Sequence, residues 1–239
     1  MTAKAKQTNG CLLMQTAQRL FGYQPSIQEE TRWRLLQSAM EVFAEVGYHA
    51  ATTREISKRA KANLASIHYY FGDKAQLYRE VFRLPFIDEC NQFNKIDIAS
   101  VTLEAALHTF YQWFFPSFGE DPMLQYFLRL HAREEAEPSG VLGNAMVEAF
   151  RPNHERMQTL LCRELGLKKP DAEVNRLTFA LLGMATVYFH GRAAISDLAP
   201  HLVDGQKSRE AMVERLVAYG VALVDAERKR RNASARAKK

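Results

Sequence analysis

The chain has little of several features that define other classes of protein. It contains 3 cysteines, and Cys11, Cys90 and Cys162 are scattered without a Cys-x-x-Cys spacing. An odd, scattered set predicts no disulfide framework and favours a reducing compartment. No apolar run approaches the length of a membrane-spanning helix, and the first residues lack the apolar core of a signal peptide. We therefore expect a cytoplasmic protein with no membrane partner.

Glycine and proline are also scarce, with 12 and 8 residues, and alternating β-branched runs are few. This pattern predicts an all-α fold, and 47% hydrophobic residues suffice for a large core in one or two domains. Enzyme signatures are missing too, including a glycine-rich phosphate loop and a nucleophile elbow. His131 opens a stretch with a superficial metalloprotease look, but no second histidine follows one helical turn later. We expect no enzyme, cofactor or metal site.

Charge is distributed unevenly along the chain. Residues 1–83 carry 12 Lys or Arg against 7 Asp or Glu, residues 84–227 carry 13 against 20, and residues 228–239 carry 7 against none. A basic head on an acidic body is typical of a phosphate-binding domain with a separate partner domain. A chance drift of surface charge is the alternative.

Residues 52–71 predict two short helices joined by a tight turn. Thr53 is expected to cap the first helix and Asn63 the second, because their side-chain oxygens can accept the free N–H groups of a helix start. Ile56 and Ile67 fall on the inward faces. The second helix carries small, polar and aromatic side chains, as a groove-reading helix requires. The stretch therefore predicts a DNA-binding helix-turn-helix, although packing alone would explain any single residue.

The polar side chains of this stretch suit different parts of DNA. Asn63, Ser66 and His68 can bond base edges or phosphates, and the hydroxyls of Tyr69 and Tyr70 can reach phosphates while their rings pack on the domain. Beyond them, a lysine in the first turn of the next helix predicts a phosphate site. The candidate DNA-binding residues are Thr52, Thr53, Arg54, Lys61, Asn63, Leu64, Ala65, Ser66, His68, Tyr69, Tyr70 and Lys74.

Residues 31–82 resemble the N-terminal domain of the TetR/AcrR family of transcriptional repressors. The matching positions are Leu36, Ala39, Phe43, Gly47, residues 52–60, residues 67–71, Asp73, Lys74 and Leu77. The resemblance implies a recognition helix from about Leu64 to Tyr70, with Thr52 and Lys74 on backbone phosphates. The chain departs from the family at Lys61, where glycine is usual. A lysine in a left-handed conformation costs strain, and it could add a phosphate contact in return.

The rest of the chain predicts further helices, over residues 103–115, 123–135, 141–165 with a break near Pro152, 171–195 and 208–228. Asp171 is expected to cap the helix that follows it, as Asp73 is expected to cap the helix that begins at Lys74, and Gly166 is expected to end the 141–165 helix. The last two are rich in small residues, namely Gly183, Ala185, Ala218 and Gly220, which permit close helix approach. The family resemblance implies that these two helices form a four-helix interface between two subunits. A homodimer would place two recognition helices about 34–36 Å apart on a palindromic operator of double-stranded DNA. Packing within one subunit is the alternative.

The resemblance also implies an effector pocket among the middle helices. The candidate lining residues are Phe110, Trp113, Phe114, Tyr126, Phe127, Arg129, His131, Tyr188 and His190. A mostly apolar pocket with a few polar groups suits a small organic molecule, whereas aromatic residues at helical spacing are also typical of a plain core. At residues 188–192 and in the helix after Pro152, the body of the chain resembles the CecR-like branch of the family.

The expected organisation has four parts. Residues 1–27 form a flexible arm, residues 28–83 a three-helix helix-turn-helix domain, residues 84–227 a helical effector-binding and dimerisation domain, and residues 228–239 a basic disordered tail. We expect a dimeric repressor that leaves its operator when an effector binds the free form better than the DNA-bound form. An adaptor that has lost DNA binding is the alternative, and activation instead of repression stays open.

Overall fold

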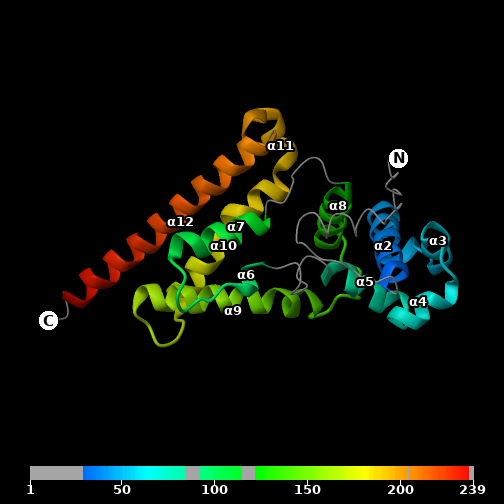
Figure 1. Ribbon diagram of the computed structural model, residues 1–239, viewed down its shortest axis with the longest axis horizontal. Helices are drawn as coiled ribbons and strands as arrows, with labels where there is room; N and C mark the ends of the chain where they lie inside the picture. The colour runs from blue at the N-terminus through cyan, green and yellow to red at the C-terminus, as the bar shows by residue number, and fades with distance from the viewer. Residues whose placement is uncertain (1–28, 84–91, 115–121, 204, 237–239) are drawn as a thin grey trace, which may run out of the picture. The chain divides into compact units, whose positions relative to one another are not determined.

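The structure, a computed structural model, describes residues 29–83, 92–114, 122–203 and 205–236 (Figure 1). Every regular element within these ranges is a helix, which confirms the all-α prediction. No helix among the described residues is both long and apolar enough to cross a membrane. The expected arm at residues 1–27 lies outside the described residues.

The chain divides into two compact units. The first combines residues 1–90 with residues 121–146, and the second combines residues 91–120 with residues 147–239. The helices of the first unit are α2 (Glu29–Ala50), α3 (Thr53–Arg59), α4 (Leu64–Phe71), α5 (Lys74–Arg83) and α8 (Pro122–Ala136). Each unit has its own apolar interior.

The core of the first unit is built on α2, which supplies an apolar stripe to its neighbours. Leu36 and Phe43 of α2 are fully buried, as are Ile56 of α3, Ile67 of α4 and Leu77 of α5. Helices α3 and α4 thus bury one or two large side chains each, and α5 buries four. Burial of a leucine or isoleucine contributes roughly 1.5–3 kcal/mol, so α3 and α4 owe their position to packing on α2 more than to their own length.

Helix α8 packs against this core, although the predicted organisation assigns residues 84–227 to the other domain. Its Leu130 is fully buried in the same cluster. The Tyr78 hydroxyl of α5 donates to the Glu134 carboxylate of α8 over 2.7 Å. Burial, together with that carboxylate, raises the pKa of Tyr78, so the phenol stays protonated and remains a donor. The division of function at residue 83 stays a prediction, but α8 is structurally part of the first unit.

The second unit holds the remaining helices. They are α6 (Gln92–Lys95), α7 (Leu103–Phe114), α9 (Ala145–Leu165), α10 (Ala172–His190), α11 (Arg192–Leu198), the 3-10 turn η2 (Pro200–Leu202) and α12 (Gly205–Arg236). Helix α12 lies against α7 and α10 (Figure 1). Gly220 makes this close approach possible, because a Cβ there would lie 2.8 Å from Leu107 Cδ1 and 3.1 Å from Leu181 Cδ2.

Several predicted helix ends are confirmed because they rest on local capping. Asp171 caps α10 by accepting from Glu173 N and Val174 N, and Gly166 follows α9 with a φ of +68°. Asp73 caps α5 through a 2.7 Å bond from Gln76 N. Such caps depend on residues within one turn, so the sequence predicts them well.

Three expectations about long helices were wrong. Helix α9 begins at Ala145 and runs through Pro152 without the predicted break. The helix that starts at Ala172 stops at His190 instead of about Ile195, because Gly191 ends it and α11 begins at Arg192. The last helix begins at Gly205 and continues past Arg228.

The basic tail is helical as far as Arg236, where a disordered segment was expected. The Arg231 guanidinium pairs with the Asp171 carboxylate over 2.8 Å, and Arg228 donates to the Glu164 backbone carbonyl over 3.2 Å. These contacts reach the end of α9 and the start of α10. They counteract the mutual repulsion of the arginines, and they anchor a stretch whose composition alone indicates disorder.

Candidate nucleic-acid interface

The first helix of the helix-turn-helix, α3, is capped by Thr52. Its hydroxyl accepts from Glu55 N at 3.1 Å while its backbone is extended, and Thr53 is the first helical residue. The cap therefore lies one residue before the predicted one, because the extended backbone that a cap needs occurs at Thr52. Thr53 and Arg54 then occupy the first turn, with the Arg54 side chain exposed.

The turn between α3 and α4 uses a left-handed residue. Lys61 has a φ of +49°, the one non-glycine residue with positive φ in the described chain. Its N–H bonds the Lys58 carbonyl at 3.1 Å, and Ala62 N bonds the Ser57 carbonyl at 3.0 Å. This pair of bonds is the Schellman arrangement, in which glycine is favoured. The predicted left-handed conformation of Lys61 is confirmed, and its side chain is exposed.

Helix α4 begins where the prediction placed it. The Asn63 side chain accepts from Ala65 N at 2.9 Å, and Ile67 and Phe71 face the core. The side chains on the opposite side are exposed, and they are Leu64, Ala65, His68 and Tyr69. Ser66 is half-buried at the edge of this surface.

The two tyrosines of α4 differ in burial, although the same role was predicted for both from the sequence. Tyr69 is 82% exposed and projects from the centre of the outward face. Tyr70 is partly buried and packs against the core of the first unit, with its ring 4.8 Å from that of Tyr69. The expectation that both rings pack on the domain was wrong for Tyr69, because the helix turns that residue directly away from Ile67.

Lys74 lies at the start of α5, but its ammonium group turns inwards. It donates to the Tyr48 and Ala51 carbonyls over 2.8 Å and 2.9 Å, and it lies 4.3 Å from the centre of the Tyr48 ring. Burial lowers the pKa of Lys74 below its ordinary value. Lys74 thereby satisfies two carbonyl groups at the end of α2. A phosphate contact by its side chain stays a prediction, and it requires Lys74 to give up one or both of these hydrogen bonds.

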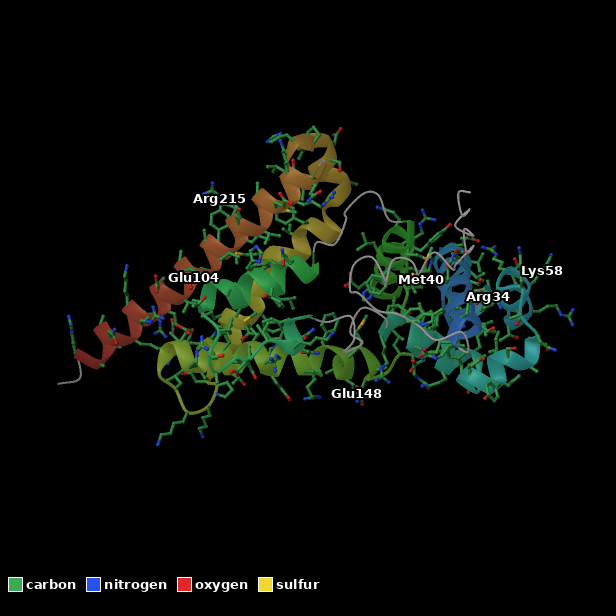
Figure 2. The ribbon with its side chains drawn as sticks, in the orientation of Figure 1. Arg34, Met40, Lys58, Glu104, Glu148 and Arg215 are labelled. Carbon is green, nitrogen blue, oxygen red and sulfur yellow. The ribbon has the colours of Figure 1, made fainter. Side chains whose placement is uncertain are left out.

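Three cations remain exposed around the helix-turn-helix. Arg54, Lys58 and Lys61 have no ion pair among the described residues, and Lys58 points outward from α3 (Figure 2). Sequence reasoning left Lys58 out of the candidate set. Its four-residue spacing from Arg54, which puts both side chains on one face of α3, was the signal that could have included it.

Arg59 joins α3 to α2 through two-point contacts with a carboxylate. It bonds both carboxylate oxygens of Glu45 on α2, at 2.9 Å and 2.8 Å, and it also pairs with Glu55 at 2.9 Å. The hydrogen bond from Arg59 holds the pKa of Glu45 below its ordinary value. Arg133 of α8 donates to the Glu45 carbonyl at 3.3 Å. Two-point Arg–carboxylate contacts fix direction as well as distance, so this cluster orients the helix that precedes the turn.

The candidate effector residues fall into both units. Tyr126, Phe127, Arg129 and His131 lie on α8 in the first unit, whereas Phe110 and Tyr188 lie in the second. The side chains of Trp113, Phe114 and His190 are outside the described set.

Several of these candidates already have packing partners. The His131 ring is 4.3 Å from that of Phe127 and 4.8 Å from that of Phe82. Phe110 is buried, and the centre of its ring lies 5.2 Å from that of Phe93. Contact with an effector therefore stays a prediction for the whole set.

Helices α10 and α12 each expose apolar side chains within the described part of the chain. Phe179 and Val187 of α10 are 61% and 54% exposed, and Tyr219 and Leu223 of α12 are 51% and 37% exposed. Of the small residues singled out in the sequence, Gly183 and Ala218 are exposed as well, whereas Ala185 and Gly220 face the interior. We call the exposed set the α10/α12 strip.

Comparison with known families matches both parts of the chain. Residues 35–81 match the family model for bacterial regulatory proteins of the tetR family. Residues 102–223 match the model for the C-terminal domain of the HTH-type transcriptional dual regulator CecR. The second match alone covers more than half of the chain.

Two relatives align over most of their own length. The HTH-type transcriptional repressor NicS of Pseudomonas putida is 26% identical over 201 residues, which cover 81% of this chain and 91% of NicS. The HTH-type transcriptional dual regulator CecR of Shigella flexneri is 25% identical over 184 residues, which cover 70% of this chain and 79% of CecR.

Solved structures share the fold. The fatty acid degradation regulator FadR from Bacillus halodurans matches with a TM-score of 0.58 at 16% identity, covering 80% of this chain and 96% of FadR. The complex of SmeT with triclosan matches with a TM-score of 0.54 at 22% identity, covering 79% of this chain and 90% of SmeT. At these identities the likeness concerns the fold alone.

Proposed function

The chain belongs to the TetR family of bacterial transcriptional regulators, and on this premise we propose that it is a homodimeric repressor that binds a palindromic operator through α4 and leaves it when a small organic effector binds. It is a regulator of transcription, not an enzyme. The proposal concerns the assembly, the form of the operator and the release.

The observation that carries the DNA-binding part is the outward face of the helix-turn-helix. Helix α4 contains no acidic residue and exposes hydrogen-bonding and aromatic side chains at His68 and Tyr69. Exposed cations at Arg54, Lys58 and Lys61 flank it. Cations suit backbone phosphates, and the side chains of α4 suit base edges in a major groove. Both requirements of sequence-specific binding therefore meet on one surface.

The α10/α12 strip supports the dimer. Monomers rarely expose a contiguous apolar surface that includes several large side chains, and the strip combines aromatic anchors with small residues. A two-fold axis would bring the strip of one subunit against the same strip of the other. Gly183 and Ala218 would then allow the helices of the two subunits to approach closely.

The direction of regulation follows the relatives with repressor function. NicS is named a repressor and CecR a dual regulator, and repression fits a protein whose binding occupies DNA that polymerase must use. Release requires an effector that binds the free form more tightly than the operator-bound form, since a ligand with equal affinity for both would shift nothing. SmeT is a relative in fold that has been solved with a small organic molecule, triclosan.

The proposal is tested by selecting bound fragments from sheared genomic DNA with the purified protein at two salt concentrations. One recurrent palindrome at both concentrations is the expected result. A matched pair of variants then separates the helix-turn-helix from bulk charge. Arg54→Ala with Lys58→Ala removes four cations from the proposed dimer, so it should weaken operator binding and reduce the slope of log affinity against log salt by about 4. Lys229→Ala with Arg236→Ala removes the same charge from α12 and should leave the slope unchanged.

Two results would count against the proposal. Diffuse binding that disappears at the higher salt concentration would leave charge alone as the source of DNA affinity, and it would favour an adaptor. Equal losses of affinity in both double variants would mean that the helix-turn-helix has no special contact with DNA.

A further inference from the structure

His68 is the one residue of the outward face of α4 whose hydrogen-bonding state the structure determines. Its imidazole is exposed on the second turn of α4, beside Leu64 and Tyr69. The Nδ1 atom lies 2.6 Å from the backbone carbonyl oxygen of Gly72. The other ring nitrogen, Nε2, is the atom left for contact with a ligand.

The bond to Gly72 fixes which nitrogen carries the proton. A carbonyl oxygen can only accept, so Nδ1 must be the donor in this pair. In a neutral imidazole, one nitrogen donates and the other accepts. Nε2 of a neutral His68 is therefore an acceptor.

The backbone at Gly72 holds this arrangement. Gly72 has a φ of +78° and ends α4, with its N–H bonded to the His68 carbonyl at 3.0 Å. Gly72 thus accepts a hydrogen bond from the His68 ring and donates one to the His68 backbone carbonyl. A side chain at position 72 would strain this left-handed conformation. Glycine therefore keeps the Gly72 carbonyl pointed at the His68 ring, where it favours the tautomer with the proton on Nδ1.

We propose that His68 is a specificity-determining residue that accepts a hydrogen bond through Nε2 from the exocyclic amino group of adenine or cytosine in the operator. In the major groove, the amino groups of adenine N6 and cytosine N4 are the donors, whereas guanine and thymine present acceptors at the corresponding atoms. Phosphate oxygens are acceptors as well, so a neutral His68 with this proton placement suits neither guanine O6 nor the DNA backbone. The inference rests on the proposed DNA-binding function of α4.

The proton placement is tested on the protein alone, without DNA. Nitrogen NMR of the full chain at about pH 8, where imidazole side chains are ordinarily neutral, distinguishes a pyrrole-type from a pyridine-type ring nitrogen. The His68→Gln variant identifies the His68 signals by their loss. We expect a proton on Nδ1 and a pyridine-type Nε2. A proton on Nε2 would overturn the proposal whatever the protein binds.

The contact itself is tested with an operator recovered by the selection described above. Each adenine in a half-site is replaced in turn by purine, and each cytosine by pyrimidin-2-one, which removes one amino group at a time. Binding of the wild type should fall about 5- to 20-fold at one position per half-site, as expected for an acceptor left without its partner. The His68→Ala variant should lose this sensitivity at that position and retain the small effects elsewhere that come from weaker base pairing.

A matched variant shows whether the coupling belongs to His68. Ser66 lies two residues before His68 on the same helix. The Ser66→Ala variant should keep the wild-type sensitivity to removal of the amino group at the base pair that His68 contacts. Additive effects of His68→Ala with every amino-group removal would overturn the proposal, as would coupling to removal of guanine N7. If no operator is recovered, the proposed function itself fails, whereas an operator bound without coupling contradicts only the role of His68.

Discussion

The outward face of α4 and the α10/α12 strip both expose large aromatic side chains, but in different surroundings. Tyr69 is 82% exposed on a helix that also exposes His68, next to a helix with exposed cations, whereas Phe179 is 61% exposed beside the His154 ring on a helix that also exposes Gly183 and Val187. An exposed ring by itself therefore says little about its partner. Cations and polar groups around the ring favour nucleic acid, and small apolar neighbours favour a second protein surface.

The largest expected effect comes from placing a charge in the strip. Leu223→Asp should convert the proposed dimer into a monomer and weaken operator binding about 100-fold or more, because two linked heads bind far more tightly than one. Light scattering after size exclusion gives the mass, and fluorescence anisotropy gives the affinity. Leu198→Asp is the control, since Leu198 of α11 is 83% exposed and lies outside the strip. A Leu223→Asp protein that remains dimeric would remove the strip from the interface.

Gly220 of α12 is buried and Gly183 of α10 is exposed, so the same substitution at both tests the difference between the interior and the exposed face of these helices. Gly220→Leu should lower the free energy of unfolding by about 1–3 kcal/mol through overpacking, because a Cβ there already lies 2.8 Å from Leu107. Gly183→Leu should leave folding of the subunit intact, since a Cβ at position 183 meets no described atom within 4 Å.

Urea unfolding of both glycine variants is best measured with Leu223→Asp present, so that dimerisation does not contribute. Equal losses of stability would mean that the two glycines do not differ in burial.

The turn of the helix-turn-helix carries a smaller, local strain. Lys61→Gly should raise the free energy of unfolding by about 0.5–1 kcal/mol, because glycine adopts the left-handed conformation of Lys61 without a steric penalty. Lys61→Ala removes the same charge but keeps the strain, so it should show no such gain. If Lys61→Gly also weakens operator binding while Lys61→Ala does not, the turn geometry and not the charge contributes to DNA recognition.

The smallest effect is a pH dependence in the second unit. The Arg231 bond, assisted by the backbone N–H groups of α10, lowers the pKa of Asp171 to about 2 from its ordinary 3.8. Because the folded pKa is the lower one, the stabilisation is present above about pH 4 and is lost as the pH falls towards 2. The carboxylate is 46% exposed, so solvent screening limits the contribution to below about 1 kcal/mol.

Asp171→Asn keeps a capping oxygen but loses the charge. Its thermal stability should therefore fall slightly at pH 6 and should change less than that of the wild type between pH 4 and 2. Indistinguishable pH profiles for the two proteins would show that the pair with Arg231 does not stabilise the fold.

The sequence predicts the helix-turn-helix almost to the residue, apart from the one-residue shift of the first cap to Thr52. Asn63, Asp73 and Asp171 cap the helices they were expected to cap, and Lys61 is left-handed as its position requires. All these features depend on side-chain and backbone groups within about one helical turn. Local chemistry of this kind is independent of the rest of the fold, so it can be read before any tertiary contact is known.

Other features could not be predicted because they depend on contacts between distant segments. Helix α8 joins the first unit through Tyr78 and Glu134, which are 56 residues apart. Lys74 turns inwards because the end of α2 offers two carbonyl groups. The composition of the tail indicates disorder, yet Arg231 finds a carboxylate 60 residues earlier in the chain. These pairings cannot be predicted from the periodicity of the sequence, because periodicity relates only residues within a few helical turns.

The sequence by itself therefore determined the helical class of this protein, the caps and turn of its DNA-reading motif and the residues available to that motif. The tertiary structure alone decided which glycine of α10 and α12 faces the interior, which tyrosine of α4 faces outwards and which ring nitrogen of His68 faces the Gly72 carbonyl. The physical reason is range. Capping and helix periodicity act over a few residues, whereas burial, ion pairing and the direction of a carbonyl group depend on what the folded chain brings alongside.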